Sequence, residues 1–186
     1  MKKRYRFFAF ILSIIVLIVC AKPLYTISMK ALYPLRYEEY ILEYTREYNL
    51  DKYLVMALIK TESNYIYNAH SGVATGLMQI TDETANWIAE KMSIEFSKDE
   101  IKNPKTNINM GCYYLRYLLD YYNEDKNLAL CAYNAGMGNV NKWLSDKEYS
   151  ENGEVLNQIP FEETRQYIEK IKKYKEIYTF LYDKED

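Results

Sequence analysis

Residues 103–122, NPKTNINMGCYYLRYLLDYY, decide the fold class of this chain. An Asn-Pro pair opens the stretch, and Pro is favoured in the first turn of a helix because the N–H that it lacks would have no partner there. Apolar residues then follow at steps of four, three, four and three, which places them on one side of an α-helix. They are Ile108, Cys112, Leu115, Leu119 and Tyr122. The stretch therefore predicts a long helix with one buried stripe.

The segments on both sides of this helix also have helical spacing. From Leu35 onward the chain has few helix breakers, and no stretch alternates as a β-strand does. Asp51 is placed to cap a helix over Lys52–Thr61, whereas residues 64–75 collect Asn, Ser and Gly, which is typical of a loop. Further helices are expected over Tyr37–Tyr48, from Thr81 or Asp82, over Leu128–Tyr133, over Val140–Leu144, and from Pro160, where Phe161, Ile168, Ile171 and Tyr178 share a face. The prediction is a compact all-α domain of about six to eight helices.

The N-terminus is a separate segment with the layout of a secretory signal or a signal anchor. Lys2, Lys3, Arg4 and Arg6 precede an uncharged run over Phe7–Ala21. This run of about 15 residues is short for a membrane-spanning helix, which needs roughly 20. The basic flank is expected to stay inside the cell and the rest of the chain to be exported.

Two features bear on the fate of this segment. Residues Leu24–Met29 can lengthen the apolar run if Lys22 extends its charge to the lipid headgroups. The sequence before Cys20 lacks the small residue of a lipoprotein signal, and no clean small-x-small cleavage site is present. An uncleaved anchor is the main interpretation, with a cleaved signal or a lipid anchor as alternatives. We expect residues 1–29 to form the anchor and juxtamembrane linker, and residues 30–186 the exported domain.

Charge excludes nucleic acid as a partner. The first 21 residues hold 4 of the 24 basic residues and none of the 26 acidic ones, so the rest of the chain has a net charge of −6. A mildly acidic domain binds phosphate backbones poorly.

The cysteine and histidine content indicates neither a metal site nor a cofactor. The chain has one His, and its Cys residues form no cluster with it, so we expect no zinc site built from protein ligands. Cys112 and Cys131 lie in apolar helical stretches and are expected to be buried free thiols. A disulfide between them is the alternative in an exported protein.

Glu62 is the first candidate for catalysis. It follows the most apolar helix of the exported part and lies where that helix gives way to a polar loop. A carboxyl group in this position is partly desolvated, which raises its pKa and lets it stay protonated as a general acid. An ordinary solvated Glu at a helix end explains the same pattern, so position alone does not decide between the two interpretations.

Four short motifs occur in order along the chain: Glu62-Ser63, Gly76–Ile80 (GLMQI), Ala132–Gly136 (AYNAG) and Glu163–Tyr167 (ETRQY). In this order and at these spacings they resemble the catalytic domain of the soluble lytic transglycosylase family, which is related in fold to goose-type lysozyme. The similarity runs over about Tyr37–Lys173. It implies a lysozyme-like all-α catalytic domain, held on the outer face of the cell membrane or, after signal cleavage, secreted.

The resemblance implies a role for each matching residue. Glu62 is implied to be the single catalytic acid/base, and Tyr167 to place its hydroxyl close to it. Arg165 is expected to form an ion pair on its own helix, with Glu162 or Glu169. The implied substrate-binding residues are Ser63, Ser71, Gln79, Met78 (packed beneath Gln79 or in the core), Tyr133, Asn134 and Tyr167.

The implied reaction cleaves the glycan strand of peptidoglycan. Protonated Glu62 donates to the oxygen of the MurNAc-β-1,4-GlcNAc bond, and the N-acetyl group of the sugar stabilises the developing cation. The C6 hydroxyl then closes on C1 and gives a 1,6-anhydro-MurNAc end. The enzyme is thus expected to be a lyase that consumes no water and uses one carboxylate, where most glycosidases use two.

Two alternatives remain open at the level of the sequence. The same site with water in place of the C6 hydroxyl would make the protein a muramidase. The other alternative is a non-catalytic peptidoglycan-binding protein within an envelope machine, whose protein partners the sequence does not identify. In each case the expected partners are peptidoglycan glycan strands and, through the N-terminal segment, the membrane.

Overall fold

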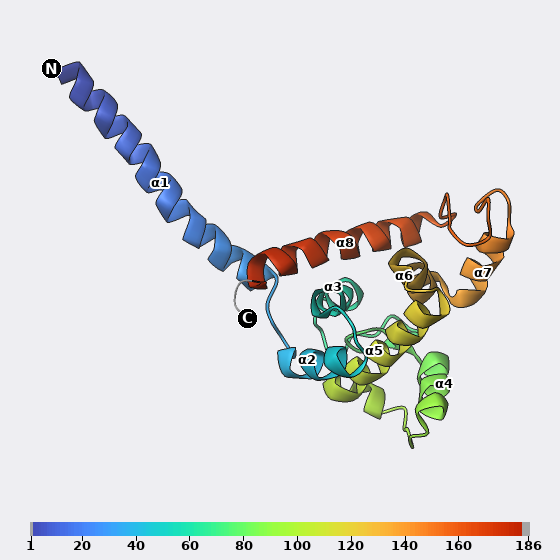
Figure 1. Ribbon diagram of the computed structural model, residues 1–186. Helices are drawn as coiled ribbons and strands as arrows, with labels where there is room; N and C mark the ends of the chain where they lie inside the picture. Colours follow the sequence, from blue (N-terminus) through green and yellow to red (C-terminus); the bar gives the residue numbers. More distant parts are fainter. Residues whose placement is uncertain (1, 184–186) are drawn as a thin grey trace.

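A computed structural model describes residues 2–183 of the chain (Figure 1). Its helices are α1 (Lys2–Leu32), α2 (Glu38–Glu47), α3 (Lys52–Glu62), α4 (Asp82–Met92), the 3₁₀ helix η1 (Glu100–Lys102), α5 (Pro104–Tyr121), α6 (Lys126–Ala135), α7 (Met137–Ser145) and α8 (Glu162–Tyr182), and its strands are β1 (Ala74–Thr75) and β2 (Ile80–Thr81). The elements from α2 to α8 surround one core, and α1 projects away from it. The predicted all-α domain is confirmed.

Helix α3 lies in this core because most of its side chains are apolar. All residues over 53–59 are buried. The predicted cap is present, since the carboxylate of Asp51 accepts hydrogen bonds from the backbone N–H groups of Tyr53 and Leu54 at 2.9 and 3.2 Å. Helix α8 packs against α3 along one side of the domain (Figure 1). Glu62, the last residue of α3, is therefore held at the end of a buried helix.

Helix α5 has the buried stripe that its spacing predicts. Asn103 caps it by accepting from the backbone N–H groups of Lys105 and Thr106, and Pro104 occupies the first turn. The stripe residues Ile108, Cys112, Leu115, Leu119 and Tyr122 are all buried. Helix α5 contacts α2, α4 and α6, and it thereby joins these helices to one core.

A short hairpin lies where the sequence indicated no strand. β1 and β2 pair antiparallel, with Ala74 opposite Thr81. Strands of two residues are too short to show an alternation of apolar and polar side chains, so periodicity does not detect them. The turn that joins them needs left-handed backbone torsions, with φ of 88° at Gly76 and 48° at Gln79.

One residue of the face predicted for α8 lies elsewhere. Ile168, Ile171 and Tyr178 are buried, as expected. Phe161 instead precedes the helix as its N-cap residue and is 48% exposed, with its ring packed against Trp143 of α7 at 4.9 Å between centroids. An N-cap residue does not have helical torsion angles, so helical spacing does not fix the direction of its side chain.

The first turn of α8 is closed by Arg165. It forms an ion pair with Glu162, one of its two expected partners. It also donates to the carbonyl oxygen of Pro160 at 3.2 Å. Arg165 therefore links the start of α8 to the loop before it.

The two cysteines of the domain are free thiols, as expected. Cys112 and Cys131 are both buried, and no disulfide joins them. Burial raises the pKa of the Cys131 thiol to about 12, so this group stays protonated and unreactive at neutral pH.

Helix α1 continues to Leu32 although Pro23 lies inside it. Its part Arg4–Leu32, 29 residues long, is long and apolar enough to cross a membrane. The helix continues past residue 29, the expected end of the anchor and linker, and Tyr33, which follows the helix, contacts the domain. The Tyr182 hydroxyl of α8 donates to the carbonyl oxygen of Tyr33 at 2.7 Å.

Candidate active site

Glu62 lines a cavity of about 360 Å³. Its walls come from the end of α3, from the segment over 63–79 and from the middle of α8. The lining residues are Lys60, Thr61, Glu62, Ser63, Asn64, Ala69, His70, Ser71, Gln79, Lys170 and Tyr174. Four of the residues predicted for the site thus share one cavity: Glu62, Ser63, Ser71 and Gln79.

The carboxyl group of Glu62 is half-buried and is hydrogen-bonded to α8. The Tyr167 hydroxyl donates to its Oε1 atom at 2.5 Å. Burial raises the pKa of Glu62 to about 7, while the hydrogen bond from Tyr167 and the charge of Lys170 act in the opposite direction and more weakly. A large fraction of this carboxyl group is therefore protonated at neutral pH and is able to donate a proton.

Ser63 joins the end of α3 to the hairpin. It is buried, and its hydroxyl lies 2.8 Å from the carbonyl oxygen of Leu77 and 3.1 Å from that of Ile59. The first of these bonds spans 14 residues of sequence. Ser63 therefore holds the turn between β1 and β2 against the helix that carries Glu62.

Gln79 and Ser71 reach the same cavity from the hairpin and the loop before it. The Gln79 Nε2 atom donates to the carbonyl oxygen of Gly76 at 2.9 Å and to that of Ala69 at 3.2 Å. Ser71 is exposed, and its backbone N–H donates to the carbonyl oxygen of Ala74 at 3.1 Å. The amide of Gln79 is thus held at its end and Ser71 is held through its backbone, and both residues line the cavity in which a ligand would contact them.

Of the two positions expected for Met78, beneath Gln79 in the cleft or in the core, the structure shows the core. Its side chain is 0% exposed. It packs so closely on Gly111 of α5 that a Cβ atom added there would lie 2.3 Å from its sulfur. An atom with no exposed surface does not touch a ligand, so Met78 supports the backbone of its neighbour Gln79 from below.

Asn107 is a supporting residue whose role the sequence did not reveal. Its side chain is buried on α5 and accepts from the backbone N–H of Met78 at 2.7 Å. It also donates to the carbonyl oxygens of Thr75 and Ile101, each at 3.0 Å. One amide thus satisfies three backbone groups. The one signal in the sequence for a buried role of Asn107 was its place directly before Ile108, the first residue of the buried stripe.

Tyr133 and Asn134 come from the C-terminal end of α6. The Tyr133 hydroxyl donates to the carbonyl oxygen of Met78 at 2.9 Å. Burial raises the pKa of Tyr133 well above its usual range, and the nearby charge of Glu62 adds to this effect. Asn134 accepts from the Thr164 hydroxyl at 2.8 Å. Neither residue lines the 360 Å³ cavity. Tyr133 is still close enough to Glu62 for the charge of that carboxyl group to act on it, and Asn134 is bonded to Thr164 at the start of α8.

Seven of the lining residues were not predicted, and four of these have side chains that can carry charge or present an aromatic ring: Lys60, His70, Lys170 and Tyr174. Two of them had a detectable signal, because Lys170 and Tyr174 follow Tyr167 by three and seven positions and so share its face of α8. His70 is fixed by contacts of its Nδ1 atom with the Ala74 carbonyl and the Thr75 hydroxyl, each at 3.1 Å.

The cavity offers a small set of reactive groups. Glu62 is the one carboxylic acid among its described lining residues. Hydroxyl, amide, imidazole and ammonium groups make up the rest of the polar lining. Over residues 2–183, no three His, Cys, Asp or Glu side chains come together as a metal site would require. The set suits a reaction in which one acid first donates a proton and later accepts one.

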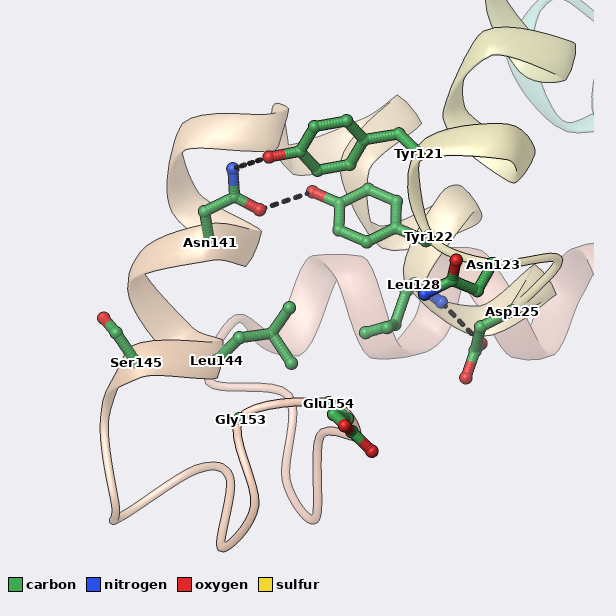
Figure 2. A pocket seen from close by; sticks show the side chains of 10 residues that line it. All are labelled: Tyr121, Tyr122, Asn123, Asp125, Leu128, Asn141, Leu144, Ser145, Gly153 and Glu154. Carbon is green, nitrogen blue, oxygen red and sulfur yellow. Dashed lines mark hydrogen bonds between the residues drawn. The ribbon is translucent and has the colours of Figure 1, made fainter.

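A larger cavity of about 820 Å³ lies elsewhere, beside α7, the start of α6 and the loop that follows α7 (Figure 2). Its polar side chains bond to one another, since Asn141 accepts from Tyr122 and donates to Tyr121, each at 3.0 Å. Asp125 is occupied as the cap of α6. None of the predicted site residues lines this cavity, so we place the candidate active site at Glu62.

Comparison with known protein families gives one match that covers most of the domain. The family described as Transglycosylase SLT domain matches residues 39–156. The soluble lytic murein transglycosylase of Salmonella typhimurium is 34% identical over 150 residues, which are 78% of this chain and 23% of that protein. The membrane-bound lytic murein transglycosylase C of Cronobacter sakazakii is 26% identical over 168 residues, which are 77% of this chain and 46% of that protein.

Solved structures match in the same way. The 70 kDa soluble lytic transglycosylase of Escherichia coli superposes with a TM-score of 0.72 at 30% identity, over 82% of this chain and 25% of that one. An inactive mutant of the lytic transglycosylase Slt from Pseudomonas aeruginosa superposes with a TM-score of 0.71, also at 30% identity, over 82% of this chain and 25% of that one. These matches confirm the predicted lysozyme-like fold. The chain spans about a quarter of the length of the soluble relatives.

Proposed function

Because this chain belongs to the Transglycosylase SLT domain family, we propose that it is a peptidoglycan lytic transglycosylase. The activity named for its relatives is the first support. The observation that carries the proposal for this chain is the carboxyl group of Glu62. It faces a cavity, is bonded to Tyr167 at 2.5 Å, and has its pKa raised to about 7 by burial.

The first step is the departure of the GlcNAc unit. Protonated Glu62 donates its proton to the oxygen that links C1 of MurNAc to GlcNAc, and the C1–O bond breaks. The carbonyl oxygen of the N-acetyl group of MurNAc bonds to C1 as the positive charge develops there. Glu62 is now a carboxylate, and the Tyr167 hydroxyl stabilises it by donating a hydrogen bond.

The second step closes the sugar on itself. The carboxylate of Glu62 takes the proton of the MurNAc C6 hydroxyl, and the hydroxyl oxygen attacks C1. The bond from the N-acetyl oxygen to C1 breaks, which leaves a 1,6-anhydro-MurNAc end and returns Glu62 to its protonated form. The proton balance is zero and no water is consumed.

The composition of the cavity favours this route over a two-carboxylate route. Retaining and inverting glycosidases place two carboxyl groups about 5 to 9.5 Å apart across the scissile bond. No second Asp or Glu belongs to the described lining of the cavity around Glu62. We therefore propose that the N-acetyl group and the C6 hydroxyl of the substrate act as the nucleophiles, with water in place of the C6 hydroxyl as the muramidase alternative. We propose that Gln79 and Ser71 contact the sugars in the cavity, and that Tyr133 and Asn134, which do not line this cavity, form the far wall of a longer substrate cleft that extends beyond it.

We further propose that α1 anchors the enzyme in the cell membrane. Residues 1–29 would be the anchor and linker, and residues 30–186 the catalytic domain on the extracytoplasmic side. The support is the apolar span Arg4–Leu32, the basic residues before it, and the membrane-bound relatives. Retention of the full chain in membranes after alkaline extraction tests this. Release of the domain into the medium would favour a cleaved signal instead.

Mass spectrometry of released muropeptides tests the reaction. The full chain in detergent is incubated with purified peptidoglycan, beside Glu62→Gln and the matched control Glu176→Gln, an exposed acid of α8. We expect 1,6-anhydro-MurNAc products from the wild type and the control and none from Glu62→Gln. Products heavier by one water, with reducing ends, would identify a muramidase. No release by the wild type would favour the non-catalytic alternative.

A further inference from the structure

Two cations line the cavity of Glu62, and a third lies near one of them, in a domain whose net charge is negative. Lys60 and Lys170 line the cavity from α3 and α8. Arg36, four positions after the end of α1, is close enough to act electrostatically on Lys60, as Lys170 also does. Burial lowers the pKa of Lys60, and these two charges lower it further. The fold therefore brings together like charges that repel one another.

None of the described ion pairs neutralises these three cations. Lys60 donates to the carbonyl oxygen of Leu32 at 2.7 Å, and its Nζ atom lies 5.1 Å from the ring centroid of Tyr33. These contacts orient the ammonium group and leave its charge in place. In the same way, the Nζ atom of Lys170 lies 5.8 Å from the ring centroid of Tyr174. The positions are thus fixed while the positive charge remains available.

We propose that Lys60 and Lys170, assisted by Arg36, form a binding site for a carboxylate carried by the muramic acid residue of the substrate. This inference rests on the proposed function and adds a specificity to it. Muramic acid bears a lactyl group that ends either in a free carboxylate or in a stem peptide with carboxylates of its own. Both sources offer the same chemistry, an anion a short distance from the sugar ring.

A carboxylate is the ligand that this arrangement suits. The pair flanks the acid that acts on the glycosidic bond, so a group that binds there belongs to a sugar next to that bond. Burial raises the pKa of Glu62 to about 7, so a large fraction of this carboxyl group is neutral at neutral pH and it offsets the charge of the two lysines only in part. A substrate carboxylate would relieve the repulsion among the three cations, and this gain would add to its own pairing energy.

Calorimetric binding to the inactive full chain tests the site without relying on turnover. Glu62→Gln in detergent is titrated with soluble peptide-bearing muropeptides whose carboxyl groups are free, and with the same muropeptides after exhaustive amidation. We expect the free form to bind about tenfold more tightly than the amidated form. In the triple variant Glu62→Gln, Lys60→Gln, Lys170→Gln this ratio falls to about one. A third ligand, peptide-free glycan with free lactyl carboxylates, then identifies which carboxylate binds. If the triple variant binds this glycan more weakly than Glu62→Gln does, the lactyl carboxylate is the ligand, and if both bind it equally, the carboxylates of the stem peptide are.

The matched control carries Glu62→Gln with Lys91→Gln and Lys173→Gln, two exposed lysines that do not line the cavity. It removes the same charge and should keep the tenfold ratio. Equal binding of free and amidated ligands by Glu62→Gln, or a ratio unchanged in the triple variant, overturns the proposal. Muropeptide release by the wild type separates the two levels of inference. If the wild type releases muropeptides but Glu62→Gln binds free and amidated ligands equally, only the carboxylate site is wrong. If Glu62→Gln prefers the free ligand but the wild type releases no muropeptides, only the proposed reaction is wrong.

Discussion

The Tyr167 hydroxyl donates to Oε1 of Glu62 at 2.5 Å, although 105 positions separate the two residues in the sequence. The bond joins the end of α3 to the N-terminal third of α8, and these two helices pack against each other. It favours the charged form of the carboxyl group and so works against burial, which favours the neutral form. The balance leaves the pKa of Glu62 at about 7, where the group can both donate and accept a proton near neutral pH.

The pH dependence of activity should reveal this balance. Because the first step needs protonated Glu62, kcat/KM of the wild type should fall as pH rises through about 7. Tyr167→Phe removes the bond that lowers the pKa of Glu62, so this fall should move to higher pH while kcat drops by about tenfold or more. Release of soluble muropeptides across the pH range measures both. Tyr113→Phe, which lies outside the cavity, should match the wild type, and a fall at unchanged pH in Tyr167→Phe would contradict the assignment.

Stability should respond to the same carboxyl group. The pKa of Glu62 rises from 4.5, its ordinary value, to about 7 on folding, so the folded state binds the proton more tightly. The contribution of Glu62 to stability is fully present below about pH 4.5 and is lost as pH rises through about 7. Glu62→Gln should therefore match the wild type near pH 4 and be about 1–2 kcal/mol more stable near pH 8, allowing for water in the cavity. Thermal unfolding followed by circular dichroism measures this, and a difference independent of pH would count against the raised pKa.

Asn107→Ala should destabilise the hairpin and the domain by removing the three hydrogen bonds of a buried side chain. The change leaves the backbone N–H of Met78 and the carbonyl oxygens of Thr75 and Ile101 without their buried partner. We expect a loss of about 2–4 kcal/mol in the free energy of unfolding and a fall in activity, because Gln79 follows Met78 directly. Urea titration and muropeptide release measure the two effects. Asn127→Ala, an exposed residue of α6, is the control and should change neither.

Two glycine-to-alanine changes in helices should have opposite effects. At Gly111, a Cβ atom would lie 2.3 Å from the sulfur of Met78 and 2.8 Å from its Cβ atom, so the core must shift. Gly111→Ala should cost about 1–3 kcal/mol. At Gly138 of α7 an added Cβ atom meets nothing within 4 Å, and Gly138→Ala should stabilise by about 0.5 kcal/mol through the loss of backbone freedom in the unfolded chain. Urea titration of both variants checks the sign, and destabilisation by both would show that the packing argument is wrong.

Much of the fold could be predicted because its determinants are local. The Asp51 cap joins residues two and three positions apart, and the buried stripe of α5 repeats every three or four. The hairpin could not be predicted from periodicity, since each strand has two residues. Phe161 was misplaced for a related reason, because helical spacing stops applying at a helix end.

The sequence by itself determined which residues are candidates for the site. A carboxyl group at the end of an apolar helix and four motifs in order are written in the chain, whatever its conformation. Only the tertiary structure decided what surrounds that carboxyl group. It brought Tyr167 and Lys170 to Glu62, moved Met78 into the core and showed the three bonds of Asn107. The physical reason is that desolvation, charge coupling and hydrogen bonding depend on distances through space, and those distances exist only after α3, α5 and α8 have packed together.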